Sequence, residues 1–361
     1  MTDTAAHPPT PSSTPAIELG LDTFGDIALG ADGEPLPAAV VIREVLAEGQ
    51  LADSLGLDFF GVGEHHRPDY AISAPDTLLA GLATTTSQIR LGTSVTVLSS
   101  DDPIRVFQRF STVDALSGGR AEICVGRGSF IESFPLFGLS LDDYEVLFSE
   151  KLDLLAKVLQ ERAFEWSGTT RPPVRTSGPV MPPTESGALR TWVGVGGTPA
   201  SVVRAAQYGM PVVIAIIGGS AAQFAPLADL YRRACAEYGY AGLPVGVHSP
   251  GHVAETDEQA VEEYLPHFIE QMRKLGRERG WAPMTEEAAR AQVGPEGAAY
   301  CGSPETVARK IVATCRTLGA KRFQFKYSNG RLPHELRMSS IRLFGEQVAP
   351  RVRELLAAGT D

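Results

Sequence analysis

Short apolar runs alternate with longer segments of helical period along most of the chain. Runs with the length and composition of strands lie at residues 17–21, 59–63, 89–97, 121–125, 192–195, 212–217, 245–252 and 322–327. Segments whose apolar residues recur every three or four positions lie at 38–55, 75–86, 103–116, 144–159, 199–208, 224–238, 257–275, 304–318 and 333–356. This alternation predicts parallel β-α units with strands that are continuously apolar because both faces are buried. Eight units favour a TIM-type (β/α)8 barrel, with an open doubly wound sheet as the alternative.

The predicted elements divide the chain into a tail and one domain. Residues 1–16 are rich in Thr, Pro, Ser and Ala and are predicted to be a disordered tail, and residues 17–361 to form the barrel. Long connections at 25–37, 165–190 and 276–299 are expected to lie mostly at the carboxyl ends of the strands, where barrel enzymes have their active sites. The last of them is an insertion that is predicted to act as a lid.

Composition and charge exclude several classes of partner. The 361 residues include 32 Lys and Arg against 43 Asp and Glu, a net charge of −11, which disfavours nucleic acids and anionic membrane surfaces. No apolar run approaches the roughly 20 residues of a membrane-spanning helix. The N-terminal residues have no secretory signal pattern, so a cytoplasmic protein is expected. The four cysteines are scattered without metal-binding spacing.

A carboxylate and two imidazoles, Glu64, His65 and His66, end the second predicted strand. Such a group could shuttle protons or bind a metal, but adjacent strand residues point to opposite faces, so the two histidines do not easily share one ion. Polar side chains that are merely satisfied at a strand end are the structural alternative. The position at the carboxyl end of a barrel strand favours catalysis.

Two further segments predict an anion site. Arg127 follows an apolar strand and is flanked by glycines, so its planar guanidinium could bind a phosphate, or equally form a salt bridge at the barrel rim. Gly197, Thr198 and Ser201 open a helix, with Thr198 as N-cap and free backbone N–H groups directed at any ligand. Together these segments form a credible phosphate clamp.

These segments, in this order, resemble the bacterial luciferase-like flavin monooxygenase superfamily from about residue 17 to 356. The resemblance is carried by Glu64-His65-His66, Ile-Arg-Leu-Gly-Thr at 89–93, Asp-Ala-Leu-Ser-Gly-Gly-Arg at 114–120, Gly126-Arg127-Gly128, residues 196–206 and Gly-Ser-Pro-Glu at 302–305. It implies a (β/α)8 barrel that binds FMN at its carboxyl-terminal face and commonly dimerises. Within the superfamily the chain is most similar to an uncharacterised FMN-dependent branch whose members share a strand end like residues 215–219.

The resemblance also assigns roles to single residues. It implies that Arg127, Gly197, Thr198 and Ser201 bind the FMN phosphate. Two further residues, Ser94 and Val95, fall where the family has a non-proline cis peptide beneath the flavin. His65 corresponds to the catalytic histidine of the luciferase catalytic subunit, with Glu64 or another neighbour setting its tautomer, and Asp22 is expected to line the pocket. Gly126 replaces the cysteine of that subunit, so light emission from a long-chain aldehyde is not implied.

The resulting hypothesis is a monooxygenase that uses molecular oxygen and reduced FMN on an unknown small organic substrate. A separate flavin reductase would supply the reduced FMN, because the sequence has no second nucleotide fingerprint. The alternatives are a deazaflavin-dependent hydride-transfer enzyme and a non-catalytic flavin-binding protein. A metal-dependent hydrolase built on Glu64, His65 and His66 ranks last.

Overall fold

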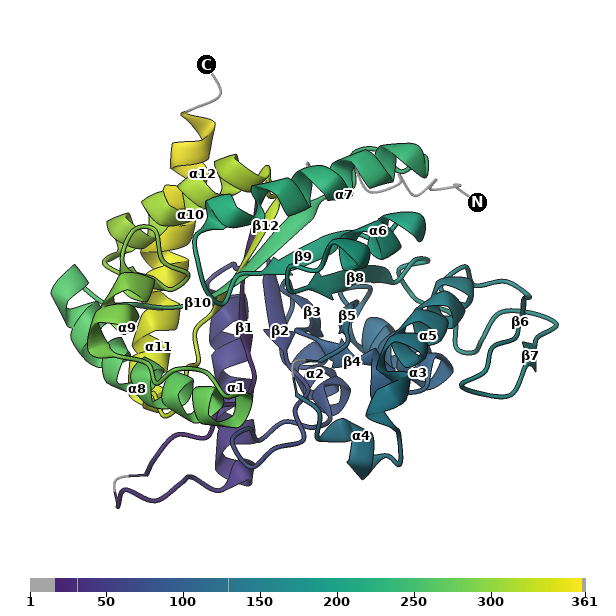
Figure 1. Ribbon diagram of the computed structural model, residues 1–361, viewed down its shortest axis with the longest axis horizontal. Coiled ribbons are helices and arrows are strands. Elements are labelled where there is room, and N and C mark those ends of the chain that lie inside the picture. Colours follow the sequence, from purple (N-terminus) through teal and green to yellow (C-terminus); the bar gives the residue numbers. More distant parts are fainter. Residues whose placement is uncertain (1–16, 31, 129, 359–361) are drawn as a thin grey trace, which may run out of the picture.

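Parallel strands form a closed barrel surrounded by helices in the computed structural model, which describes residues 17–30, 32–128 and 130–358 (Figure 1). The barrel strands are β1 (Glu18–Thr23), β2 (Phe59–Val62), β3 (Arg90–Thr93), β4 (Thr96–Val97), β5 (Glu122–Gly126), β8 (Arg190–Val195), β9 (Val212–Ala215), β10 (Val245–Val253) and β12 (Arg322–Lys326). Their hydrogen-bonded order is β3-β2-β1-β12-β10-β9-β8-β5-β4. A parallel bridge between Leu91 of β3 and Ala121, the residue before β5, closes the barrel. The predicted barrel is confirmed, and the predicted tail at 1–16 lies outside the described residues.

Helices follow the strands as the periodicity predicts, except that α4 was not predicted and the predicted helix at 333–356 is divided into α11 and α12 by a π-helical turn at Phe344–Val348. They are α1 (Ala38–Ser54), α2 (Pro75–Ala83), α3 (Pro103–Ser117), α4 (Ser133–Leu136), α5 (Tyr144–Val158), α6 (Pro199–Gln207), α7 (Ala225–Glu237), α10 (Pro304–Leu318), α11 (His334–Leu343) and α12 (Ala349–Ala357). The capping of α3 shows why its bounds fall where they do. The Asp102 carboxylate accepts hydrogen bonds from the backbone N–H groups of Ile104 and Arg105, and Gly118 ends the helix in a left-handed conformation, with φ of 65°.

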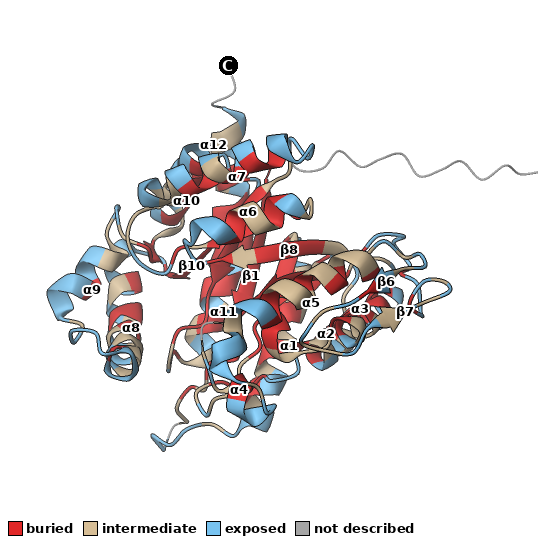
Figure 2. Cartoon of the chain, turned by 45° about the vertical axis from the view of Figure 1, so that its right-hand side comes forward, coloured by how far each residue is buried: buried red, intermediate tan, exposed pale blue. Residues whose placement is uncertain are grey.

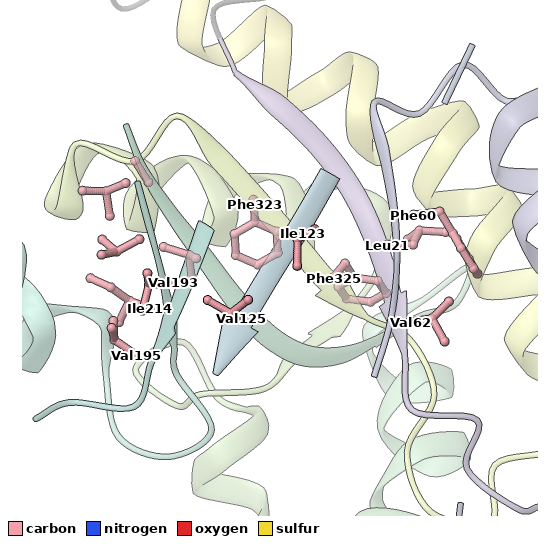
Figure 3. Close-up of a cluster of buried hydrophobic side chains, with 14 of the residues drawn as sticks. Leu21, Phe60, Val62, Ile123, Val125, Val193, Val195, Ile214, Phe323 and Phe325 are labelled. Carbon is pink, nitrogen blue, oxygen red and sulfur yellow. The ribbon is translucent and has the colours of Figure 1, made fainter. Parts of the chain in front are cut away.

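Side chains alternate between the two faces of the barrel strands. One set packs against the helices in a single hydrophobic core, and Figure 3 labels Leu21, Phe60, Val62, Ile123, Val125, Val193, Val195, Ile214, Phe323 and Phe325 from it. The opposite set mixes polar and small residues, such as Glu18, Gly20 and Asp22 along β1, with a small apolar cluster of Cys124, Trp192 and Val213. Ser94 just after β3 bonds Gln324 of β12, two strands that are not neighbours, so these side chains cross the barrel interior. The expectation of continuously apolar strands holds for β2 and β9 but not for β1, β5 and β12, which carry buried charged or polar side chains such as Asp22, Glu122 and Gln324.

A buried ion cluster fills the amino-terminal end of the barrel. Arg322 is fully buried, donates to Glu18 at 2.7 Å and pairs with Glu122 through two nitrogens. Arg190 also donates to Glu18, at 2.7 Å, and the Arg322 guanidinium lies 4.4 Å from the ring centre of Trp192. Each of the four charged residues opens or nearly opens its strand, so the cluster joins four strands at one level of the barrel. Figure 2 shows this central sheet as buried and the outer helix faces as exposed.

The long connections differ from expectation. The predicted insertion before the last strand is confirmed, but it consists mainly of the end of α8 (Asp257–Arg279), α9 (Glu286–Val293) and β11 (Tyr300–Gly302). The connection at 165–190, with the hairpin β6 (Glu165–Trp166) and β7 (Val174–Arg175), runs from α5 to the start of β8. It therefore lies toward the amino-terminal end, and its placement at the opposite end was wrong. Figure 1 shows this hairpin on the other side of the molecule from α8 and α9.

Candidate active site at the carboxyl end of the barrel

His65 lies just beyond β2 inside a cage of aromatic rings. Its ring centre is 4.6 Å from that of Phe24, 4.3 Å from that of Tyr70 and 5.3 Å from that of Phe130. The Nε2 atom is buried and has no hydrogen-bond partner among the described residues. Burial, followed by the positive charge of nearby Lys326, lowers the pKa of His65 to about 3. The imidazole is therefore neutral near pH 7.

Glu64 points away from this cage. Its Oε1 lies 2.9 Å from Nε2 of His66, and its Oε2 accepts a hydrogen bond of 2.9 Å from the backbone N–H of Val97 in β4. The expectation that Glu64 sets the tautomer of His65 is thus wrong, because this carboxylate contacts the neighbouring histidine, His66.

Within the described residues, no three His, Cys, Asp or Glu side chains are grouped as a metal site requires. In the same part of the chain, no helix is long and apolar enough to cross a membrane.

A second histidine completes the polar interior near this end. Asp22 of β1, fully buried, lies with its Oδ2 2.7 Å from Nδ1 of His248 in β10, while its Oδ1 has no partner among the described residues. Phe24 stacks against the His248 ring at 5.9 Å. The sequence singled out Asp22 but missed His248, which comes from a strand 226 residues away. The available signal was its place as a titratable residue on a predicted strand.

The floor of the barrel mouth is built around Ser94 and Val95. The peptide bond between them is cis, as the resemblance implies, and it separates β3 from β4. Ser94 donates to Oε1 of Gln324 at 3.2 Å. A Cβ atom added at Gly126 would lie 2.7 Å from Val95, and one at Gly194 2.8 Å from it. The replacement of a cysteine by Gly126 therefore fits a close approach of these strands.

The fold brings Arg127 close to the start of α6, as the predicted phosphate clamp needs. Arg127, just after β5, lies with Nη2 3.5 Å from the Ser201 hydroxyl on α6. Thr198 occupies the N-cap position, but its side chain forms no capping hydrogen bond. Residues 196–200 are exposed, and a Cβ atom added at Gly196 would meet nothing within 4 Å. Open backbone donors, a hydroxyl and a guanidinium thus converge as a phosphate requires.

Two residues that the sequence analysis missed adjoin this clamp. Glu145 in the first turn of α5 pairs with Arg127 and, at 3.3 Å, with Arg204 of α6. The Arg127 guanidinium also lies 5.2 Å from the ring centre of Tyr144. The sequence gave no sign that Glu145 pairs with Arg204, because the packing of α5 beside α6 depends on the order of the strands in the barrel.

Phe130 connects the clamp to the aromatic cage. It follows Arg127 by three residues and packs against His65, and the Arg67 guanidinium lies 4.3 Å from its ring centre. Arg67 in turn donates to Glu132 at 2.5 Å and to Glu278 of α8 at 2.7 Å. The end of α8 is therefore tied by ion pairs to the loops that hold His65, consistent with the position expected of a lid.

The family of the chain follows from a direct match. A family model described as luciferase-like monooxygenase matches residues 23–322, and the chain belongs to this family. The chain is similar to the alkanal monooxygenase alpha chain of the Kryptophanaron alfredi symbiont, at 25% identity over 68% of this chain and 70% of that protein. It is also similar to the uncharacterized protein y4vJ of Sinorhizobium fredii, at 36% identity over 36% of this chain. That match spans only 38% of the length of y4vJ.

Solved structures share the fold across almost the whole chain. Monooxygenase RslO1 from Streptomyces bottropensis superposes with a TM-score of 0.78 and 23% identity, over 92% of this chain and 99% of that chain. The oxygenating constituent of 3,6-diketocamphane monooxygenase from Pseudomonas putida, in complex with FMN, gives 0.72 and 20%, over 93% and 99%. Coenzyme F420-dependent tetrahydromethanopterin reductase from Methanopyrus kandleri gives 0.70 and 17%, over 93% and 99%. The fold therefore occurs with both kinds of coenzyme.

Proposed function

We propose that the protein is a monooxygenase that uses reduced FMN and molecular oxygen to oxidise a small organic substrate. The observation that carries the proposal is the clamp of Arg127, Ser201 and the start of α6, which adjoins the His65 cage at the carboxyl end of the barrel. The family of the chain and a neighbour solved with FMN support it. Reduced FMN would come from a separate reductase, because the sequence has no dinucleotide fingerprint of its own.

The clamp would hold the FMN phosphate. Arg127 offers a forked pair of donors, Ser201 a hydroxyl, and Gly197 and Thr198 the free N–H groups at the positive end of α6. Val95, packed closely against Gly126 and Gly194, would form the floor beneath a flat ring system, which, when bound and reduced, supplies the electrons that activate oxygen.

The aromatic cage would exclude water from the reacting centre. Phe24, Tyr70 and Phe130 surround the imidazole of His65, and their apolar faces keep it neutral. A neutral imidazole can donate or accept one hydrogen bond but cannot serve as a cationic acid at pH 7. His65 is therefore proposed to position a reacting group through its unpartnered Nε2.

Proton transfer falls instead to Asp22 and His248 in this proposal. The Asp22 carboxylate, 2.7 Å from Nδ1 of His248, would accept a hydrogen bond from the N–H group there and so leave Nε2 as the acceptor of the ring. This nitrogen can take a proton and return it, while Asp22 stabilises the cation that forms. Both side chains are buried, which shields the transfer from bulk water.

Titration of the apo-protein with FMN, oxidised and then reduced under anaerobic conditions, tests the proposal. We expect FMN binding that weakens about 10- to 100-fold in Arg127→Gln, since charge-assisted hydrogen bonds contribute about 1.5–3 kcal/mol. Riboflavin, which lacks the phosphate, serves as the control and should bind both proteins equally. Failure of FMN to bind in either redox state would refute the proposal. Binding without substrate-dependent oxygen consumption in a substrate screen would instead indicate a flavin-binding protein.

A deazaflavin-dependent hydride-transfer enzyme is the second candidate. The fold similarity to the F420-dependent reductase favours it, with a TM-score of 0.70. The two candidates differ in their use of oxygen. Reduction of a deazaflavin coenzyme by candidate alcohols, without oxygen consumption, would support this alternative over the FMN monooxygenase.

A further inference from the structure

Glu145 occupies an unusual place between two arginines of the phosphate clamp. One carboxylate oxygen pairs with Arg127, and the other lies 3.3 Å from Nη2 of Arg204. The Glu145 side chain is 62% exposed, whereas those of Arg127 and Arg204 are 23% and 19% exposed. The carboxylate therefore sits on the solvent side of two largely covered cations.

Arg204 belongs to the same face of α6 as the clamp. It follows Ser201 by three residues, a spacing that places both side chains on one side of the helix. Its guanidinium lies 5.6 Å from the ring centre of Phe148, and its Nη1 is buried without a hydrogen-bond partner among the described residues. Arg204 thus has one donor nitrogen on Glu145 and one donor nitrogen unused.

The helix dipole alone does not account for this geometry. An acidic residue in the first turn of α5 stabilises that helix wherever its carboxylate points. The Glu145 carboxylate instead bridges cations from two other elements, the end of β5 and α6. A bridging carboxylate offers two anionic oxygen acceptors, as does the phosphate group that the same two guanidinia would bind.

We propose that Glu145 is an internal counter-anion of the phosphate clamp, which an incoming phosphate displaces, and that Arg204 is a second phosphate-binding arginine. This inference rests on the proposed function. The covered arginines stay in place against Tyr144 and Phe148, while the exposed carboxylate turns into solvent. Since phosphate must compete with Glu145, FMN binds more weakly than it would to the same two arginines without a carboxylate between them. The flavin then exchanges as a co-substrate, as supply by a separate reductase requires.

Binding of FMN and riboflavin to Glu145→Gln and Arg204→Gln tests the proposal. We expect Glu145→Gln to bind FMN about fivefold more tightly than wild type, the effect of removing one partly exposed charge. Arg204→Gln should bind FMN about tenfold more weakly. Riboflavin should bind all three proteins equally. Inorganic phosphate, the probe without a ring, should raise the thermal unfolding midpoint of Glu145→Gln more than that of wild type.

Glu286→Gln is the matched control. Glu286 also lies in the first turn of a helix, is 65% exposed and pairs with an arginine, Arg290, at 2.8 Å, but belongs to α9. Its replacement should leave FMN affinity unchanged. Urea denaturation verifies that each variant is folded.

The outcomes separate this inference from the function on which it rests. If FMN binds wild type and weakens in Arg127→Gln, but Glu145→Gln matches wild type, the counter-anion is overturned and the proposed function stands. If Arg204→Gln also matches wild type, its phosphate role is overturned. If FMN binds none of the proteins, including Glu145→Gln, both the proposed function and this inference fail.

Discussion

The neutral state of His65 makes the free energy of unfolding depend on pH. The folded pKa of about 3 lies below the ordinary value of 6.5, so between these values the unfolded chain binds a proton that the folded chain does not. Stability from this group is therefore complete above pH 6.5 and is lost as the pH falls toward 3. At pH 5, 1.5 units below the unfolded pKa, the loss is about 2 kcal/mol at 1.36 kcal/mol per unit.

Urea denaturation of wild type and His65→Gln at pH 8 and pH 5 measures this loss. Other groups also titrate, so the informative quantity is the difference between the two proteins. We expect wild type to lose about 2 kcal/mol more than His65→Gln over this interval. The amide retains hydrogen-bonding atoms and the approximate size of the imidazole but has no titration in this range.

His334 provides a control of opposite sign. A hydrogen bond to Glu48 raises the pKa of His334, so its stabilisation is complete below pH 6.5 and is lost as the pH rises through the folded value. His334→Gln should therefore reduce the loss of stability toward high pH rather than toward low pH. If His65→Gln keeps the full acid sensitivity of wild type, His65 is not held neutral, and its proposed positioning role is refuted with it.

Two further predictions concern the barrel interior. Arg322→Gln should lower the free energy of unfolding by about 3–5 kcal/mol in urea denaturation, because it leaves two buried carboxylates without their main partner; a loss below about 1 kcal/mol would contradict the buried cluster. Gly194→Ala should cost about 1–3 kcal/mol, since its Cβ atom would meet Val95 at 2.8 Å. Gly196→Ala, whose Cβ atom would meet nothing within 4 Å, should cost less than 1 kcal/mol, and equal losses in the two glycine variants would show that packing against Val95 is unimportant.

Local patterns were sufficient to predict the strands and to single out Arg127 and Ser201, which the fold brings together. The eight runs coincide with barrel strands because every strand contributes an apolar outer face that repeats along the chain. These two residues could be singled out because Arg127 and the start of α6 each have a recognisable pattern within a few residues. The connection at 165–190 was misplaced, although its position after a helix and before a strand assigns it to the amino-terminal end.

Side-chain contacts between strands that are far apart in the sequence could not be predicted from these local patterns. The pairing of Asp22 with His248 depends on β1 and β10 lying on either side of β12, which the sequence does not state. Glu64 contacts His66 and not His65. This contact likewise depends on β4, because the backbone N–H of Val97 holds the other carboxylate oxygen of Glu64. Side-chain partners across the interior follow from strand order and register, whereas secondary structure follows from periodicity.

The ion cluster around Arg322 has a consequence for the opposite end of the barrel. Its two arginines and two glutamates sum to zero charge, so it contributes little net field to the reacting centre. Arg322 and Lys326 are four residues apart on β12, roughly 13 Å at the rise of a strand. The cluster therefore closes the amino-terminal end of the barrel with mostly buried side chains that carry no net charge. Ligands are then expected to enter at the carboxyl-terminal end. Substitutions of charged residues at the carboxyl-terminal end should therefore leave the ion cluster around Arg322 intact.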